Sequence, residues 1–277
     1  AAEATDTTSL TAFGTDGFTV STNVGLNTNT STYVAWNWKA PTSSNLTAAG
    51  AISISTTSKL NLDAGFEIIT YTGSGTAGNT IGHSLGKVPD LIIGKNRTYA
   101  DSWWVYHREK VDHTKKIHLN LTDAAVSNNS TFNNTAPTSS LITLGSDIRS
   151  NNSSYTYLMY AFCSVDGYSK IGSYTGNGQG DDNTFVYTGF RVKYVLIKAS
   201  SAVEPWMIMD AVRHPHNEND AQIRADSANA ETNDGNGIDL LSNGFKIKSA
   251  IGNWGSNGVT YIYMAFAETP FKYSNAR

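Results

Sequence analysis

The sequence has little charge, a single cysteine and no long apolar run. Charged residues make up 16% of the 277 positions, with 20 Lys+Arg against 23 Asp+Glu. Electrostatic nucleic-acid binding needs a basic stripe, so a net charge of −3 argues against it. No stretch approaches the roughly 18 consecutive apolar residues of a membrane helix, and the polar start, Ala1 to Leu10, does not resemble a secretory leader. The lone cysteine excludes an intramolecular disulfide framework. We therefore expect neither nucleic-acid binding nor membrane insertion.

Uncharged hydrogen-bonding side chains replace the missing charge. The chain has 26 Asn, 32 Thr and 29 Ser, whereas ordinary domains carry about 25% charged residues. Aromatic residues reach 11%, which argues against disorder. No methionine precedes Met159, so we expect a processed chain, a fragment or the ordered part of a longer protein.

An internal repeat organises the chain. The stretch Tyr71 to Gly75 (YTGSG) reappears at Tyr174 to Gly178 (YTGNG), 103 residues later. Three further blocks follow in the same order at an offset of 103 or 104. The paired blocks are Leu91–Lys95 with Tyr194–Lys198, Trp103–Tyr106 with Trp206–Met209, and Thr156–Phe162 with Thr260–Phe266. Two copies of one module, each of domain size, explain this order.

A partial third copy comes first. Asp16 to Val20 resembles Asn243 to Ile247, and Thr32 to Trp38 resembles Thr260 to Phe266. The expected domains are therefore a partial module with linker at 1–45, a first complete module at 46–165 and a second at 166–277. Half a sandwich leaves strand edges and an apolar face uncovered, so we expect a neighbouring module or another chain to cover them.

The repeated blocks indicate strands. Phe66–Tyr71, Asp90–Ile93, Trp103–Tyr106, Lys116–Leu121 and Thr156–Phe162 are short and rich in β-branched and aromatic residues. Ala51–Ser55 is a further candidate strand, and Asp210–Asp226 is the best helix candidate, although Pro215 interrupts it. The pattern predicts an all-β fold of tandem antiparallel β-sandwich modules, of jelly-roll or lectin-like type.

The nucleophile and general-base candidates do not form a set. Cys163 corresponds to Ala267 in the other copy, which favours a buried small side chain over a nucleophile. His107 corresponds to Asp210, and His83 to Val186, so no histidine belongs to the module itself. We expect a protein that is not an enzyme.

One run has the composition of a metal site. His214, His216, Glu218 and Asp220 alternate, and on an extended strand they would share one face. Imidazole and carboxylate groups bind zinc and related divalent metals. Because the run also contains Pro and Asn, a solvated loop is the alternative, and no other cofactor is expected.

Four aromatic residues form a candidate glycan-binding platform. Trp103, Trp104, Tyr106 and Trp206 offer apolar faces on which a sugar ring stacks. Trp103 and Trp206 occupy the same position in both copies, which also suits core anchors. Trp104 points the opposite way on a strand, and we expect it at the surface.

A family resemblance covers nearly the whole chain. The blocks that carry it are Asp16–Val20, Thr32–Trp36, Phe66–Gly73, Val88–Ile93, Trp103–His107, Phe185–Phe190, Leu241–Phe245, Tyr261–Glu268 and Phe271–Arg277. In these blocks the chain resembles a repeat module of predicted virion structural proteins from marine bacteriophages. The resemblance implies lectin-like β-sandwich modules in tail fibres, appendages or particle surfaces, and it carries over no catalytic residues.

The expected function is therefore structural. We expect a tail-fibre or appendage component on the virion surface that contacts the host, with a capsid-decorating protein and a carbohydrate-binding lectin or glycan-active enzyme as alternatives. Expected partners are other virion proteins, further copies of the chain (the resemblance implies trimers) and a host-surface glycan.

Overall fold

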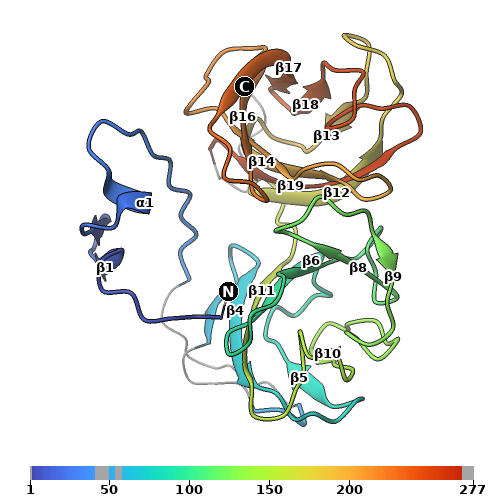
Figure 1. Cartoon of the computed structure of the whole chain (residues 1–277). Coiled ribbons are helices and arrows are strands. Elements are labelled where there is room, and N and C mark those ends of the chain that lie inside the picture. The colour runs from blue at the N-terminus through green and yellow to red at the C-terminus, as the bar shows by residue number, and fades with distance from the viewer. Residues whose placement is uncertain (1, 41–49, 54–57, 270–277) are drawn as a thin grey trace.

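The protein is built almost entirely from antiparallel β-strands. A computed structural model describes residues 2–40, 50–53 and 58–269. Helix accounts for 2% of the part of the chain that the structure describes, so the all-β prediction is confirmed. Residues 2–40 form an N-terminal arm, residues 58–163 a first module and residues 168–268 a second module (Figure 1).

The first module is a seven-stranded sheet covered on its inner face by a two-stranded one. The large sheet has the order β3-β4-β11-β6-β7-β8-β9, and β5 pairs with β10. The bounds are β3 Lys59–Asn61, β4 Phe66–Thr72, β5 Thr80–Gly82, β6 Leu91–Asn96, β7 Trp104–His107, β8 Lys115–His118, β9 Val126–Ser127, β10 Leu141–Thr143 and β11 Thr156–Phe162.

The second module uses the same plan. Its strands run in the order β12-β19-β14-β15-β16-β17-β18-β13. The bounds are β12 Ser169–Thr175, β13 Phe185–Tyr187, β14 Val192–Ala199, β15 Met207–Asp210, β16 Asn219–Arg224, β17 Thr232–Leu241, β18 Gly244–Ile247 and β19 Thr260–Ala267. The order β12-β19-β14-β15-β16 reproduces β4-β11-β6-β7-β8, so the sequence repeat is a repeat of topology.

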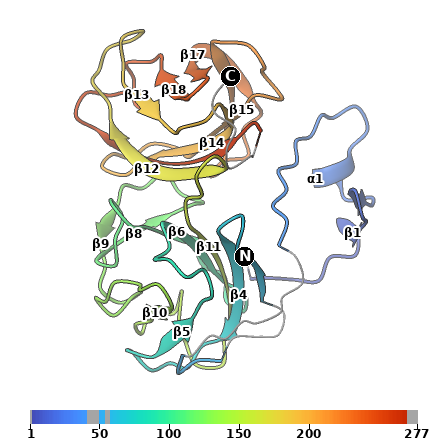
Figure 2. The same ribbon diagram turned by 180° about the vertical axis from the view of Figure 1, so that it is seen from behind.

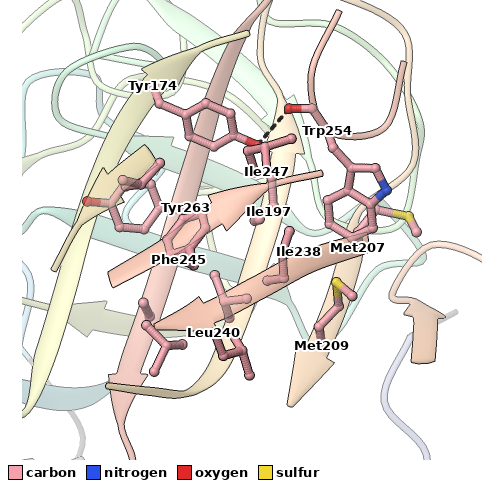
Figure 3. Close-up of a cluster of buried hydrophobic side chains, with 14 of the residues drawn as sticks. Tyr174, Ile197, Met207, Met209, Ile238, Leu240, Phe245, Ile247, Trp254 and Tyr263 are labelled. Atoms are coloured by element: carbon pink, nitrogen blue, oxygen red, sulfur yellow. Dashed lines mark hydrogen bonds between the residues drawn. The ribbon is translucent and has the colours of Figure 1, made fainter. Parts of the chain in front are cut away.

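The two modules also share a tyrosine pair. Tyr71 stacks on Tyr157 in the first module, with ring centroids 5.1 Å apart. Tyr174 stacks on Tyr261 in the second, at 5.0 Å. All four rings are buried, and the hydroxyl of Tyr174 donates a hydrogen bond to the Trp254 carbonyl in the core shown in Figure 3.

The second tyrosine of each pair holds the preceding turn. Its hydroxyl donates to the carbonyl nine residues earlier and accepts a hydrogen bond from the amide five residues earlier. These partners are Ile148 and Asn152 for Tyr157, and Gly252 and Ser256 for Tyr261. The same tyrosine therefore fixes the same turn in both copies.

The modules pack together through the outer faces of their large sheets. Phe66, Leu91 and Phe162 of the first module join Tyr194, Met264 and Phe266 of the second in one apolar cluster. Polar bonds cross the same interface, including His107 Nε2 to the Gly172 carbonyl (3.1 Å) and Trp206 Nε1 to the His118 carbonyl (2.8 Å). Both faces of the central strands β6, β7 and β15 are buried, and the two modules lie against each other as one body (Figure 2).

The arm is a small unit beside this body. It consists of the hairpin β1 Leu10–Phe13 and β2 Phe18–Val20, followed by the four-residue helix α1 Val24–Asn27. In both Figure 1 and Figure 2 this hairpin stands apart from the two modules. Residues 34–38 return to the body, where Trp36 and Trp38 pack on Tyr194.

Several strand predictions are confirmed and others are wrong. β4, β6, β7 and β11 match their predicted blocks, but β8 ends at His118 because the chain turns there and the Leu121 amide donates to the His118 carbonyl. The region 210–226 contains a loop and β16 instead of a helix, with Pro215 in the loop. In the candidate strand Ala51–Ser55, Ile52 forms an isolated bridge to Ile81, and residues 54–55 lie outside the described residues, as do residues 41–45 of the expected linker.

Candidate interaction surface

The expectation that Trp104 lies at the surface is wrong. Trp104 and Tyr106 are each 2% exposed and belong to the inner core of the first module. Trp104 lies against Gly94, its cross-strand neighbour, and its Nε1 donates to the Arg149 carbonyl at 3.1 Å. Both rings pack on Phe132, in the connection between β9 and β10, so this aromatic pair is a core element.

Trp103 is the aromatic residue that remains partly exposed. It lies on the outer face of the sheet and stacks on Tyr160, with the rings 7° from parallel and 6.5 Å apart. Its repeat counterpart Trp206 is buried in the interface between the modules. Of the four predicted platform residues, only Trp103 therefore offers a face to a ligand.

A cleft of about 480 Å³ opens beside Trp103, between the two modules. Trp38 of the arm, Ile68, Leu119 and Tyr160 also line it. The described lining residues carry no charge. This chemistry suits apolar contact better than the dense hydrogen bonding that orients a sugar.

The candidate catalytic residues are buried structural groups. Cys163 is 3% exposed, and burial raises the pKa of its thiol to about 11, which keeps it protonated. The expectation of a buried small side chain is confirmed. His107 is 1% exposed, and burial lowers its pKa to about 4, so the neutral ring bonds the Gly172 carbonyl between the modules.

The four predicted metal ligands are not brought together as a set. His214, His216 and Glu218 lie in the loop before β16, and only Asp220 lies on the strand. His214 Nε2 approaches Asp220 Oδ1 at 3.6 Å. Glu218 and Asp220 instead accept hydrogen bonds from backbone amides of β17. In the described part of the chain, no group of three His, Cys, Asp or Glu side chains is arranged to hold a metal ion. The loop alternative fits this geometry.

The arm hairpin presents an apolar pair to solvent. Phe13 lies opposite Phe18, and the two are 78% and 39% exposed. The equivalent cross-strand pair in the second module, Leu240 and Phe245, is 2% and 0% exposed. The arm therefore repeats a hairpin whose apolar face is buried in a complete module, and it leaves that face open.

Sequence reasoning found the similarity of this segment to the second module but did not single out Phe13 and Phe18. The similarity of residues 16–20 to residues 243–247 already aligns Phe18 with Phe245. Extending the alignment back by the same offset places Phe13 on Leu240, which is the signal that identifies the pair. Isolated apolar residues at a surface are ordinary, whereas this cross-strand pair matches a core position.

Among the described residues, no helix is long and apolar enough to cross a membrane.

Similarity to other proteins defines a family. Comparison with curated proteins found no match, and comparison with solved structures found none. Residues 1–270 match the family model described as "Domain of unknown function (DUF7483)", which spans the arm and both modules. The chain therefore belongs to the DUF7483 family.

Proposed function

We propose that this protein is a structural component of a bacteriophage particle, a tail-fibre or appendage protein on the virion surface. It acts through non-covalent contacts with other virion proteins and with the host surface, without catalysis. The observation that carries the proposal is the open apolar face at Phe13 and Phe18, which is buried at the equivalent position of the second module.

The construction of the body supports this proposal. The two modules share an apolar cluster and hydrogen bonds across their outer faces. We expect this shared interface to resist hinge motion between the modules. A protein that spans or decorates a particle benefits from this stiffness, and its uncharged polar side chains suit contact with neighbours.

The test is to locate the protein in an infection. Mass spectrometry of purified particles detects it, and immunogold microscopy places it on the tail, an appendage or the capsid. Gold on the tail or appendages supports the proposal, and gold on the capsid selects the decoration alternative. Detection only in infected cytoplasm contradicts both.

A lectin function remains the candidate of another class, and the Trp103–Tyr160 stack favours it. A glycan array with the purified chain tests it. Binding that is lost in Trp103→Ala and kept in Val203→Ser supports a lectin, because Val203 is an exposed apolar residue elsewhere (68%). An array without hits argues against it.

A further inference from the structure

The arm is folded as the C-terminal half of a module. The Tyr33 hydroxyl donates to the Val24 carbonyl (3.2 Å) and accepts a hydrogen bond from the Thr28 amide (2.9 Å). These partners lie nine and five residues earlier, as they do for Tyr157 and Tyr261. Next to its turn the arm hairpin also keeps the register of β17 and β18, because the pairs Ala12–Thr19 and Phe13–Phe18 correspond to Asp239–Lys246 and Leu240–Phe245. The third copy therefore has the module's own local structure.

In a complete module, the N-terminal half supplies the contacts that the arm lacks. Tyr33 is 49% exposed, whereas Tyr157 and Tyr261 are 1% and 0% exposed beneath their stacking partners. Those partners, Tyr71 and Tyr174, lie on β4 and β12, in the N-terminal half of each module. The missing cover is thus an N-terminal half-module.

The last segment of the arm, residues 32–38, also lacks partners that the N-terminal half of a complete module supplies. Residues 32–38 correspond in sequence to β11 and β19, yet they form no strand. β11 pairs with β4 on one side and β6 on the other, and β19 pairs with β12 and β14. All four neighbours belong to N-terminal halves. Without them the backbone groups of residues 32–38 have no ladder to join.

We propose that the inner face of the arm is a docking site for the N-terminal half of a module of this same repeat, donated by a separate polypeptide chain. The donor supplies a strand of the Tyr-Thr-Gly type, whose tyrosine stacks on Tyr33. It adds a second strand on the other side of residues 32–38 and an apolar surface that covers Phe13 and Phe18. This deepens the proposed function and rests on it for the setting in an assembly.

The path of the chain into the arm supports a donor on a separate chain. Glu3 is held on the first module, where its amide donates to the Arg97 carbonyl at 2.8 Å and its carboxylate pairs with the Arg97 guanidinium. The equivalent position in the second module, Ala230, lies in the short connection from β16 to β17. The chain therefore enters β1 from the first module, whereas it enters β17 from the neighbouring strand β16.

A second copy in the fold described here has no free half to give. Its β4–β8 and β12–β16 strands are already paired within their own modules. The donor is therefore a chain with an unpaired N-terminal half-module. Main-chain pairing along residues 32–38 would supply affinity, and the pockets for Phe13, Phe18 and Tyr33 would supply specificity.

Photo-crosslinking in the full-length chain tests the proposal. The photoreactive residue p-benzoylphenylalanine replaces Phe13, or Val203 as a matched exposed control, and the native assembly is irradiated. We expect the Phe13 position to attach to a peptide of another chain that carries this repeat's N-terminal strand pattern, and the Val203 position not to do so. The same probe at Phe18 repeats the measurement independently.

Every other product overturns the proposal. Attachment to the arm of a second copy indicates arm-to-arm pairing, attachment to lipid or glycan indicates direct surface binding, and no product at either Phe position indicates an uncovered face. The crosslinked peptide is sequenced from any assembly that contains the protein, whether or not that assembly is a virion. A protein absent from virions therefore refutes the proposed function, whereas a wrong peptide refutes only the docking partner.

Discussion

Phe13 and Phe18 face each other across the arm hairpin in the register that Leu240 and Phe245 adopt across β17 and β18. One pair is exposed and the other is fully buried. The same hairpin therefore occurs twice in one chain, covered by a half-module at β17–β18 and uncovered in the arm. This comparison gives the assembly proposal its physical basis, since the exposed face has the composition of a core.

Equivalent substitutions in the two hairpins are expected to differ in cost. In the isolated chain, Phe13→Ser changes the free energy of unfolding by less than about 0.5 kcal/mol, because the ring is mostly in water. Leu240→Ser costs about 3–5 kcal/mol, because it opens a cavity and buries a hydroxyl. Urea denaturation measures both values. An equal cost at the two positions shows that the arm face is already covered in the isolated chain.

The Gly94–Trp104 pair predicts a second contrast. A Cβ at Gly94 would lie 2.0 Å from the Trp104 ring, so Gly94→Ala destabilises the chain by about 1–3 kcal/mol or more. Gly17→Ala is the control, since nothing lies within 4 Å of a Cβ there. The second module places Ile197 opposite Met207 at the same positions.

The double variant Gly94→Ile with Trp104→Met copies the second module's pair. It is expected to recover more than half of the stability that Gly94→Ile loses alone, as coupled neighbours do. Thermal and urea denaturation of the two single variants and the double variant complete the cycle. If the stability losses of the two single variants add up in the double variant, the two side chains do not share one space.

Two buried groups predict opposite pH trends. Burial raises the pKa of Glu67 from 4.5 to about 7, so the folded chain keeps a proton that the unfolded chain releases, and stability falls as pH rises from 4.5 to 7. Burial lowers the pKa of His107 from 6.5 to about 4, so stability rises as pH rises from 4 to 6.5. Each trend amounts to about 3 kcal/mol, at about 1.4 kcal/mol per pKa unit.

Single variants separate these two trends between pH 4.5 and 6.5. Relative to the wild-type chain, Glu67→Gln makes the slope of stability against pH more positive, and His107→Gln makes it more negative. Denaturation at closely spaced pH values measures the slopes. A wild-type slope in either variant means that the substituted group does not titrate as described.

The buried thiol is expected to be dispensable. Cys163→Ala changes stability by less than about 1 kcal/mol, because the second module holds Ala267 at this position and the thiol makes only weak contacts with the Lys87 and Val88 carbonyls. The native thiol reacts with a disulfide reagent at least about a hundredfold more slowly than the denatured chain. Rapid native reaction contradicts a buried protonated thiol.

Sequence reasoning predicted the elements whose pattern is local. The blocks around Phe66, Leu91 and Thr156 became strands because β-branched and aromatic residues dominate them. Their repetition also anticipated that the two modules share one strand order. Residues 32–38 resemble a strand block but form no strand, because a strand needs neighbours and no strand of the described chain pairs with this segment.

For a related reason, the sequence could not predict which of Trp103 and Trp104 faces the core of the module. Alternation separates the two faces of a strand, but it does not tell which face is the core when both are buried. The outer face of β7 packs against another module, and the inner face against a loop-rich layer. Only the tertiary packing decides that Trp104 is enclosed and Trp103 lines the cleft.

Chemical nitration of Tyr33 tests the central claim most directly. In the isolated chain its ring is 49% exposed, and Tyr187, at 64%, serves as the internal reference. We expect both to be nitrated in the isolated chain, and Tyr33 alone to be protected in the native assembly, because the donor tyrosine stacks on it. Equal nitration of Tyr33 in the isolated chain and in the assembly would contradict the covering of the arm.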